Sequence, residues 1–265
     1  MSLHVRDYGE GPVLVLLHAF PCDGRMWEQQ ATAASAAGWR VIVPDLPGFG
    51  ASALPPTEPA LGVVALAVAG MLEDRGVDRC VLGGVSLGGY VAMELVRTRP
   101  TLFAGLVLCD TKASADSEAA RENRERLARR CLDSPGDFPR ILEEAVLPGL
   151  LGDTTRERRP EVVARVGGWL READATAVAW YQRAMADRPD SLADLADADL
   201  PTLVVWGEED ALSDRAEQER MVGAVTAASL VVVPEAGHLA NVEVPAAVSS
   251  AIVRFLSVMP GQSPA

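Results

Sequence analysis

The stretch Gly84-Val85-Ser86-Leu87-Gly88 lies between a short apolar run that ends at Gly83 and a segment of helical period that continues to Arg99. A serine in such a strand-to-helix turn exposes its hydroxyl, and glycines two residues away on each side let neighbouring backbone approach closely. The helix that follows points free N–H groups and the positive end of its dipole at the serine, which favours negative charge there. The pattern predicts that Ser86 is a nucleophile.

Two other interpretations fit a glycine-rich loop. A turn without a chemical role has the same composition, and the motif alone does not exclude it. A phosphate-binding loop needs the lysine of a P-loop or the glycine order GxGxxG, and residues 83–89 have neither. The choice between a plain turn and a nucleophile therefore depends on whether a base and an acid occur at suitable places in the chain.

A base must remove the proton of a serine hydroxyl, and histidine is the usual base. The chain has three histidines, which are His4, His18 and His238. His238 follows the last apolar run, so its loop is expected at the same edge of the sheet as Ser86. His4 lies in an N-terminal strand, and His18 is expected to support its own loop by hydrogen bonding. A loop or N-cap histidine without a catalytic role is the alternative for His238.

The third member of a triad is a carboxylate that orients the imidazole. Asp210 follows another apolar run, at residues 203–206, and is expected at the same sheet edge. Competing carboxylates are Glu208, Glu209 and Asp110, and Asp210 also fits an N-cap. The chain order Ser86, Asp210, His238 is the order described for α/β-hydrolases. We therefore predict a triad of these three residues.

An oxyanion hole needs two backbone N–H groups, one of them from the residue after the nucleophile. Leu87 supplies this group. The second is expected from the loop after the run at residues 13–17, which contains Phe20 and Pro21. Proline has no N–H to donate, so Phe20 is the candidate.

Short apolar runs without alternation are typical of strands buried on both faces of a parallel sheet. They are Val13–Leu17, Arg40–Pro44, Cys80–Gly83, Leu106–Cys109, Leu203–Trp206 and Leu230–Val233. An alternating run at Leu3–Tyr8 predicts an edge strand. Segments of helical period predict helices at Gly24–Ala37, Leu61–Arg75, Gly88–Arg99, Arg215–Ala227 and Ala246–Leu256. The pattern predicts an α/β fold with a mostly parallel sheet flanked by helices.

Residues 111–198 interrupt this alternation. They contain no convincing buried strand and are rich in Ala, Arg, Glu and Leu at helical spacing, with several prolines. This composition predicts a helical insertion in a core formed by residues 1–110 and 199–265. The acidic, alanine-rich stretch Ala193–Asp199 is expected to be the linker that returns to the core.

Composition limits the partners and the location. A net charge of −13 argues against a nucleic-acid partner. The arginines of residues 121–130 alternate with glutamates at helical spacing, which is typical of a solvated helix face; a basic patch for an anionic substrate is the alternative. Apolar runs are too short to span a bilayer, no signal peptide is apparent, and the four cysteines lack metal-ligand spacing. We expect no membrane partner and a cytoplasmic location, and the sequence is compatible with a homo-oligomer.

These motifs resemble those of the α/β-hydrolase fold family over nearly the whole chain. The shared stretches are Leu17–Pro21, Asp45–Ser52, Gly84–Gly88, Gly207–Asp210 and Gly237-His238. The resemblance implies a serine hydrolase with a helical cap (lid) over the site, here from residues 111–198, and no metal or organic cofactor. It also implies that Ser52 belongs to a structural turn. Many members have His-Gly where this chain has His18-Ala19. Residues 185–191 and 208–210 look most like small esterases and 3-oxoadipate enol-lactonase-like proteins.

The expected reaction is hydrolysis of a small carboxylic ester or lactone through an acyl-enzyme. A carbon–carbon bond hydrolase or a cofactor-free perhydrolase would use the same triad, and a non-catalytic small-molecule binding protein is a further alternative. Pocket candidates are Trp27, Trp169, Trp180, Tyr181 and Met185, of which Tyr181 and Met185 also fit the core of a cap. Candidate cationic partners for a carboxylate on the substrate are Arg121, Arg124 and Arg188.

Overall fold

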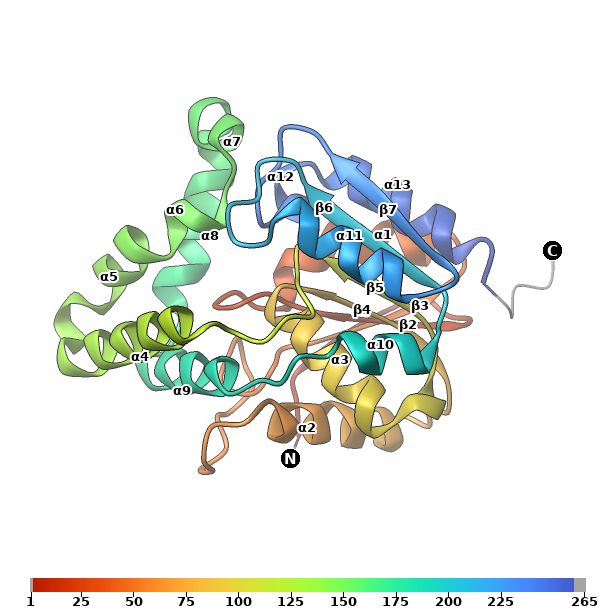
Figure 1. Cartoon of the computed structure of the whole chain (residues 1–265), viewed down its shortest axis with the longest axis horizontal. Helices are drawn as coiled ribbons and strands as arrows, with labels where there is room; N and C mark the ends of the chain where they lie inside the picture. Colours follow the sequence, from red (N-terminus) through yellow and green to blue (C-terminus); the bar gives the residue numbers. More distant parts are fainter. Residues whose placement is uncertain (1, 260–265) are drawn as a thin grey trace.

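A computed structural model describes residues 2–259, apart from the side chain of Pro135, and contains a seven-stranded sheet between layers of helices (Figure 1). The strands are β1 (Val5–Tyr8), β2 (Val13–Leu17), β3 (Arg40–Pro44), β4 (Cys80–Val85), β5 (Phe103–Cys109), β6 (Thr202–Gly207) and β7 (Ala228–Val233). They lie in the order β1-β3-β2-β4-β5-β6-β7. Within the described residues β1 pairs antiparallel with β3 and the other pairs are parallel. The predicted mostly parallel sheet is confirmed.

Strand β4 lies at the centre of the sheet, between β2 and β5, and all six of its residues are buried. Its position explains the absence of alternation in its sequence, because both of its faces are covered. Strand β7 corrects the prediction that its run is buried on both faces. It forms the edge of the sheet, and of its six residues only Val233 is fully buried. An apolar run therefore did not distinguish a central strand from an edge strand.

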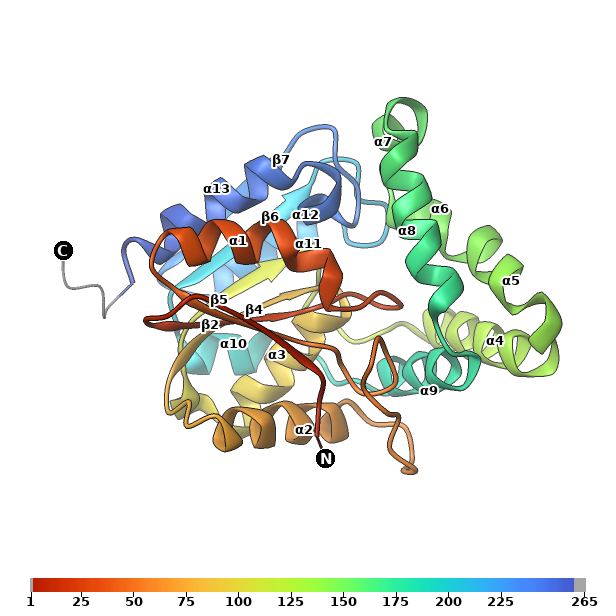
Figure 2. The ribbon, with the colours of Figure 1, turned by 180° about the vertical axis from the view of Figure 1, so that it is seen from behind.

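Helices cover both faces of the sheet. On one face, α1 (Glu28–Ala36) packs against α13 (Pro245–Leu256). The other layer consists of α2 (Leu61–Asp74), α3 (Leu87–Thr98), α10 (Leu192–Ala198) and α11 (Arg215–Ala224), of which α2 contacts α3, and α10 contacts both α3 and α11. Figure 2 shows α1 and α13 in front of the sheet, whereas Figure 1 shows α3, α10 and α11 in front of it.

Several helix boundaries differ from the predictions. The segment expected as one helix from Gly24 is a 3-10 turn, η1 (Gly24–Trp27), followed by α1. The stretch 193–199, expected as a linker, is mostly helix α10. Leu195 on this helix is buried, and Leu192 and Ala198 pack against the core, so a few apolar contacts hold a short polar helix there. No helix within residues 2–259 is long and apolar enough to cross a membrane.

All regular secondary structure between β5 and α10 is helical. The helices are α4 (Glu118–Asp133), η3 (Pro135–Asp137), α5 (Phe138–Ala145), α6 (Leu147–Leu150), α7 (Asp153–Arg158), α8 (Pro160–Glu172) and α9 (Ala175–Ala186). Helices α4 to α9 stand together on one side of the sheet in both ribbon views (Figures 1 and 2), and α4 packs along α9. The division into a core and a cap at residues 111 and 198 stays a prediction.

Candidate active site

Ser86 lies in the one-residue turn between β4 and α3. Its backbone has a φ of 52° and a ψ of −110°, a left-handed conformation that is costly for a residue with a Cβ atom. Packing holds this turn, because a Cβ atom on Gly84 would lie 2.2 Å from the carbonyl carbon of Gly88. A Cβ atom on Gly88 would lie 2.2 Å from the backbone oxygen of Leu17. Both glycines of the motif are therefore required by the close approach of backbone segments.

The structure brings Ser86, His238 and Asp210 into hydrogen-bond contact. The Oγ atom of Ser86 lies 2.8 Å from Nε2 of His238. The Nδ1 atom of the same ring lies 2.9 Å from each carboxylate oxygen of Asp210. His238 is 4% exposed and Asp210 is 8% exposed, so the charge of the carboxylate acts on the imidazole with little screening by water. With Nδ1 protonated by this contact, Nε2 is free to accept the hydroxyl proton.

Local donors hold Asp210 in its ionised form. The backbone N–H groups of Leu212 and Ser213 and the hydroxyl of Ser213 donate to its carboxylate. Burial raises the pKa of Asp210, but the charge and hydrogen bond of His238, together with these donors, outweigh burial and lower the pKa below its ordinary value. Asp210 is therefore a carboxylate at neutral pH.

The carboxylates that compete with Asp210 in the sequence have other partners. Asp110 is fully buried at the end of β5, and its two oxygens accept the N–H groups of Gly207 and Ala240. Burial and the nearby charge of Asp210 raise the pKa of Asp110 well above its ordinary value. Asp110 thus ties together the loops that contain Asp210 and His238. Glu208 is exposed, and Glu209 bonds to Thr154.

Of the two residues expected to supply oxyanion donors, Phe20 lines the same cavity as Ser86, and Leu87 follows Ser86 in the chain. Among the described residues, neither the Phe20 N–H nor the Leu87 N–H has a protein hydrogen-bond partner, so both are available to a ligand. His18 supports the Phe20 loop: its Nδ1 lies 2.9 Å from the Ala19 oxygen, and its Nε2 accepts the N–H of Leu46 at 2.8 Å. Burial lowers the pKa of His18, which agrees with a neutral ring that donates through one nitrogen and accepts through the other.

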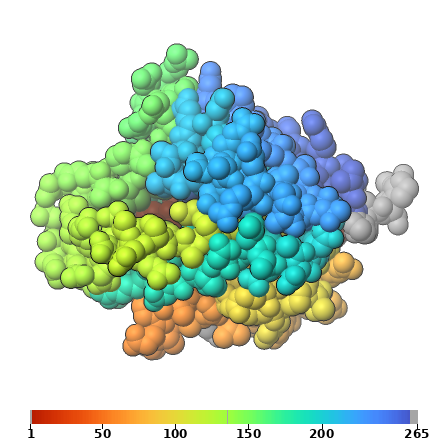
Figure 3. Space-filling model, in the orientation of Figure 1, coloured from red at the N-terminus to blue at the C-terminus, as the bar shows by residue number. Residues whose placement is uncertain are grey.

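A cavity of about 310 Å³ opens onto Ser86 and His238. Figure 3 shows a hollow between the yellow-green helix α4 and the blue C-terminal part of the chain, with dark red N-terminal residues at its bottom. The apolar part of its wall consists of Phe20, Tyr90, Ala120, Leu127, Ala145, Val146, Gly149, Leu150, Met185 and Leu212. Its polar and charged part consists of Lys112, Asp116, Asn123, Arg124 and Gln182. Residues from both the sheet edge and helices α4 to α9 enclose the site.

Of the five predicted pocket residues, only Met185 lines this cavity. Trp27 is fully buried in η1, within the core. Trp180 donates its indole N–H to the Thr57 oxygen at 2.9 Å, and Tyr181 packs on Phe49 with ring centroids 4.8 Å apart. Both aromatic rings thus pack between α9 and the core, and neither lines the Ser86 cavity.

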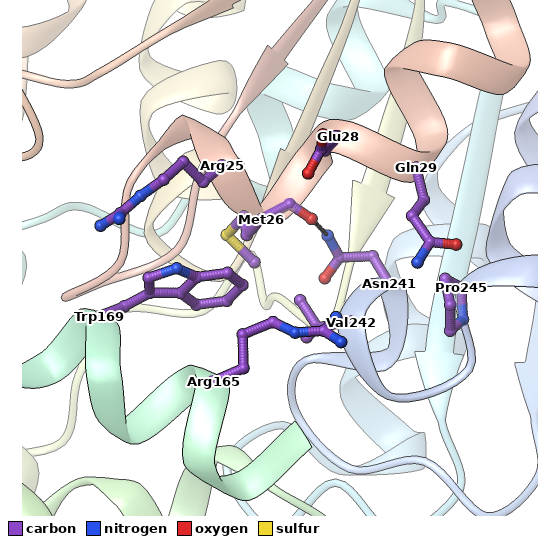
Figure 4. Close-up of a pocket in the computed structure, with 9 residues that line it drawn as sticks. All are labelled: Arg25, Met26, Glu28, Gln29, Arg165, Trp169, Asn241, Val242 and Pro245. Carbon is purple, nitrogen blue, oxygen red and sulfur yellow. Dashed lines mark hydrogen bonds between the residues drawn. The ribbon is translucent and has the colours of Figure 1, made fainter. Parts of the chain in front are cut away.

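Trp169 lines a different cavity, of about 350 Å³, between α8, the η1 turn and the segment after His238 (Figure 4). Its wall consists of Arg25, Met26, Glu28, Gln29, Arg165, Trp169, Asn241, Val242 and Pro245. None of these residues is a serine, cysteine or histidine, so the cavity has no counterpart of the Ser86–His238 pair. The cavity at Ser86 is the candidate active site. No cluster of three or more potential metal-ligating side chains occurs in residues 2–259.

Two glutamates connect the inserted helices to the loops that contain Asp210 and His238. They are the buried Glu243, which sequence reasoning did not single out, and the half-buried Glu209. Glu243, which is 3% exposed, accepts the N–H groups of Gly237 and Leu239 on either side of His238, at 2.9 and 3.2 Å. Its other oxygen accepts the N–H of Gly152, next to α7, at 2.9 Å. Glu209, adjacent to Asp210 in the chain, accepts the N–H of Thr154 at 2.8 Å. One segment of the insertion is therefore bonded to both loops.

The match to known proteins agrees with this geometry. The sequence matches the alpha/beta hydrolase family over residues 14–251. The chain belongs to this family. The solved structure of a thermophilic esterase from Thermogutta terrifontis superposes with a TM-score of 0.91 at 38% identity, and the match covers 96% of this chain and 93% of that chain.

Two further members of the family are similar over most of their length. A pimeloyl-(acyl-carrier protein) methyl ester esterase of Aeromonas hydrophila is 31% identical over 249 residues, which are 90% of this chain and 92% of that protein. The enol-lactonase of Burkholderia xenovorans LB400 superposes with a TM-score of 0.87 at 26% identity, covering 96% of each chain. This α/β-hydrolase is thus similar to proteins named for ester and lactone hydrolysis.

Proposed function

We propose that this α/β-hydrolase cleaves a small carboxylic ester or lactone with Ser86 as nucleophile, His238 as base and Asp210 as the orienting acid. The observation that supports this most strongly is the continuous pair of contacts from Ser86 Oγ to His238 Nε2 and from His238 Nδ1 to Asp210. The names of its relatives, which are esterases and an enol-lactonase, favour an acyl carbonyl as the reacting group.

In the proposed first step, Ser86 Oγ forms a bond to the carbonyl carbon while its proton passes to His238 Nε2. The electron pair of the carbonyl bond moves to the oxygen, and the N–H groups of Phe20 and Leu87 donate to the resulting oxyanion. The free N–H groups at the start of α3 add a positive potential at the same place. Asp210 stabilises the imidazolium that forms.

In the proposed second half, His238 returns the proton to the leaving alcohol oxygen as its bond to carbon breaks, which leaves an acyl-enzyme on Ser86. A water molecule then loses a proton to His238 and attacks the acyl carbon. Collapse of this second oxyanion releases the acid and gives the proton back to Ser86. For a lactone the same bond breaks when the acyl-enzyme forms, but the alcohol stays tethered to the acyl part through the carbon chain, so the product is a single hydroxy acid.

We further propose that residues 111–198 form a cap that selects the substrate. Most residues that enclose the cavity around Ser86 come from this segment, among them Leu127, Val146, Leu150 and Met185. A small-molecule ester or lactone fits the volume of about 310 Å³. The cytoplasmic location, the absence of a nucleic-acid partner and the compatibility with a homo-oligomer stay predictions from the sequence.

Purified protein with a panel of p-nitrophenyl esters and simple lactones tests the proposal. Ser86→Ala is expected to lower kcat/KM by roughly 10⁴-fold or more, because one missing triad member disables the unit. The exposed Ser250 on α13 offers a matched control, and Ser250→Ala is expected to keep full activity. Ester turnover by Ser86→Ala at the wild-type rate would refute the assignment.

A further inference from the structure

A group of charged side chains forms part of the wall of the Ser86 cavity. Lys112, Asp116 and Arg124 line it, and Arg188 lies behind them. We refer to these four residues as the cationic cluster. The apolar wall described above supplies the other lining of the cavity, so the charges are concentrated in one part of it.

The cluster has an excess of positive charge. Burial raises the pKa of Asp116, but its bonds to Arg124 and Arg188 outweigh burial and hold the pKa below its ordinary value, so the side chain is a carboxylate. Three cations therefore surround one anion, which leaves two net positive charges. This excess is notable in a chain whose net charge is −13.

Arg188 and Asp116 form the structural part of the cluster. The side chain of Arg188 is 4% exposed and lies 2.8 Å from Asp116. It also donates to the backbone oxygens of Met185 and Ser114, and its guanidinium lies 4.0 Å from the centre of the Tyr90 ring. These contacts engage both terminal nitrogens of Arg188, and only its Nε lacks a hydrogen-bond partner among the described residues. Arg188 itself does not line the cavity.

Lys112 has no comparable structural role. Its ammonium is 3.8 Å from Asp116, too far for a hydrogen bond, and it donates to no other group among residues 2–259. Its side chain is 23% exposed. Arg124 is 20% exposed and bonds to Asp116 through Nε and weakly to Gln182 through one terminal nitrogen, at 3.3 Å. The second terminal nitrogen of Arg124 and the ammonium of Lys112 are therefore available as donors.

We propose that Lys112 and Arg124 form a subsite for a carboxylate on the substrate, separate from the carbonyl that is hydrolysed. The inference rests on the proposed function, because it describes the same cavity. An ammonium and a guanidinium bind a carboxylate through charge-assisted hydrogen bonds, which are stronger in a partly enclosed site than on an open surface. The substrate is thus a small ester or lactone with a second, anionic end, and the apolar wall contacts the part between its two ends.

The subsite can be tested with monomethyl esters of straight-chain dicarboxylic acids, from malonic to pimelic acid. Each is compared with the methyl ester of a monocarboxylic acid of equal length, which lacks the negative charge. The ratio of kcat/KM for the anionic ester to that for its neutral counterpart is expected to reach about tenfold at the best length, mainly through KM. The ratio is expected to fall as salt is raised from about 0.01 to 0.5 M. O-acetyl esters of hydroxy acids place the carboxylate on the alcohol side and show which half of the substrate occupies the subsite.

Lys112→Met is expected to reduce this ratio by about tenfold, and the ratio cancels any general loss of activity. Lys112→Arg keeps the positive charge and is expected to retain a preference for the anionic ester. Arg129→Met, on the exposed side of α4, removes one charge from the same region and is expected to leave the ratio unchanged. The subsite would be overturned if neutral esters were hydrolysed and anionic esters were not preferred at any chain length, with the carboxylate on either the acyl or the alcohol side. That result would leave the proposed function standing.

Calorimetric binding gives a second readout that needs no turnover. Ser86→Ala protein is expected to bind the preferred monomethyl ester about tenfold more tightly than Ser86→Ala/Lys112→Met protein. Equal affinities would overturn the subsite. A difference in affinity together with inactive wild-type protein would support the subsite and contradict the proposed hydrolysis.

Discussion

Glu243 provides a quantitative test of how the inserted helices and the His238 loop depend on each other. One of its oxygens accepts two N–H groups, from Gly237 and Leu239, and the other accepts the N–H of Gly152. All three bonds are buried. In Glu243→Gln, the amide oxygen can replace the first oxygen, but the amide NH₂ then faces the Gly152 N–H, so that a donor opposes a donor.

The expected loss follows from the number of unsatisfied donors. An unsatisfied buried N–H costs about 1–3 kcal/mol, so Glu243→Gln is expected to lower the free energy of unfolding by about that amount. At this chain length 1 kcal/mol corresponds to roughly 2–4 °C in Tm. Glu243→Ala leaves three donors without an acceptor, and we expect about two to three times the loss of the glutamine variant.

The two variants are expected to differ in activity as well. Glu243→Gln keeps the bonds on both sides of His238, so it is expected to lose more in stability than in kcat. Glu243→Ala frees the His238 loop and is expected to lower kcat about tenfold or more, since small misplacements of a catalytic group are costly. Urea unfolding followed by tryptophan fluorescence, together with ester kinetics on the same preparations, measures both quantities.

The exposed Glu144, paired with Arg140 on α5, provides the control. Glu144→Gln is expected to change the unfolding free energy by less than about 0.5 kcal/mol. This role of Glu243 would be contradicted if the unfolding free energy of Glu243→Ala were within about 0.5 kcal/mol of that of the wild type. It would also be contradicted if Glu243→Ala were no less stable than Glu243→Gln.

Three further outcomes are expected. Asp210→Asn is expected to be less stable than the wild type at pH 7, and the difference should shrink as the pH falls below about 4. Because folding lowers the pKa of Asp210, its carboxylate stabilises the fold above the pKa of the unfolded state, and this stabilisation is lost as the pH falls through the pKa of the folded state. Thermal unfolding at several pH values checks this. The four buried cysteines are expected to resist Ellman's reagent at pH 8 until the protein is denatured. The reagent reacts with the thiolate, and burial raises the pKa of the Cys80 thiol to about 12 and that of the Cys131 thiol to about 11. Rapid labelling of native protein would contradict this. Gly88→Ala is expected to lower kcat at least about 100-fold, since a Cβ atom there meets backbone. Gly70→Ala in α2, where a Cβ atom has open space, is expected instead to add about 0.5–1 kcal/mol of stability. Kinetics and urea unfolding of both variants test the pair.

The parts of the fold that could be predicted from the sequence are those in which local pattern and burial coincide. Strands β2 and β3 have the bounds expected from their apolar runs, because each lies in the interior of the sheet. Strand β7 has a similar composition but lies at the edge, and nothing in its own residues records which neighbours cover it. Helix α10 depends on a contact with distant helices, which a local pattern of acidic and alanine residues does not reveal.

The proposed triad was predictable for a related reason. Ser86, Asp210 and His238 each follow a strand of the same parallel sheet, so topology alone places them at one edge. The pocket was not predictable in this way. Trp180 and Tyr181 are on the helix that encloses the site, but which face of α9 points inward depends on its packing with α4 and the core.

Arg124 and Arg188 were predicted from the sequence as candidate partners of a substrate carboxylate, and Arg121, named with them, does not line the Ser86 cavity. Asp116 and Glu243 were missed because their partners are far apart in the chain. Asp116 meets Arg188 across 72 residues of sequence, and Glu243 meets Gly152 across 91. Neither arrangement has a spacing that a motif could encode. Only the packing of the inserted helices against the sheet creates them.

The most direct test of the central claim is labelling of the intact protein with a fluorophosphonate, followed by peptide mass spectrometry. Such a reagent phosphonylates a serine whose proton is removed by a base. We expect a single adduct, on the peptide that contains Ser86, and a labelling rate that falls at least about 100-fold in His238→Ala. No adduct, an adduct on another serine, or an unchanged rate in His238→Ala would contradict the proposed nucleophile and base.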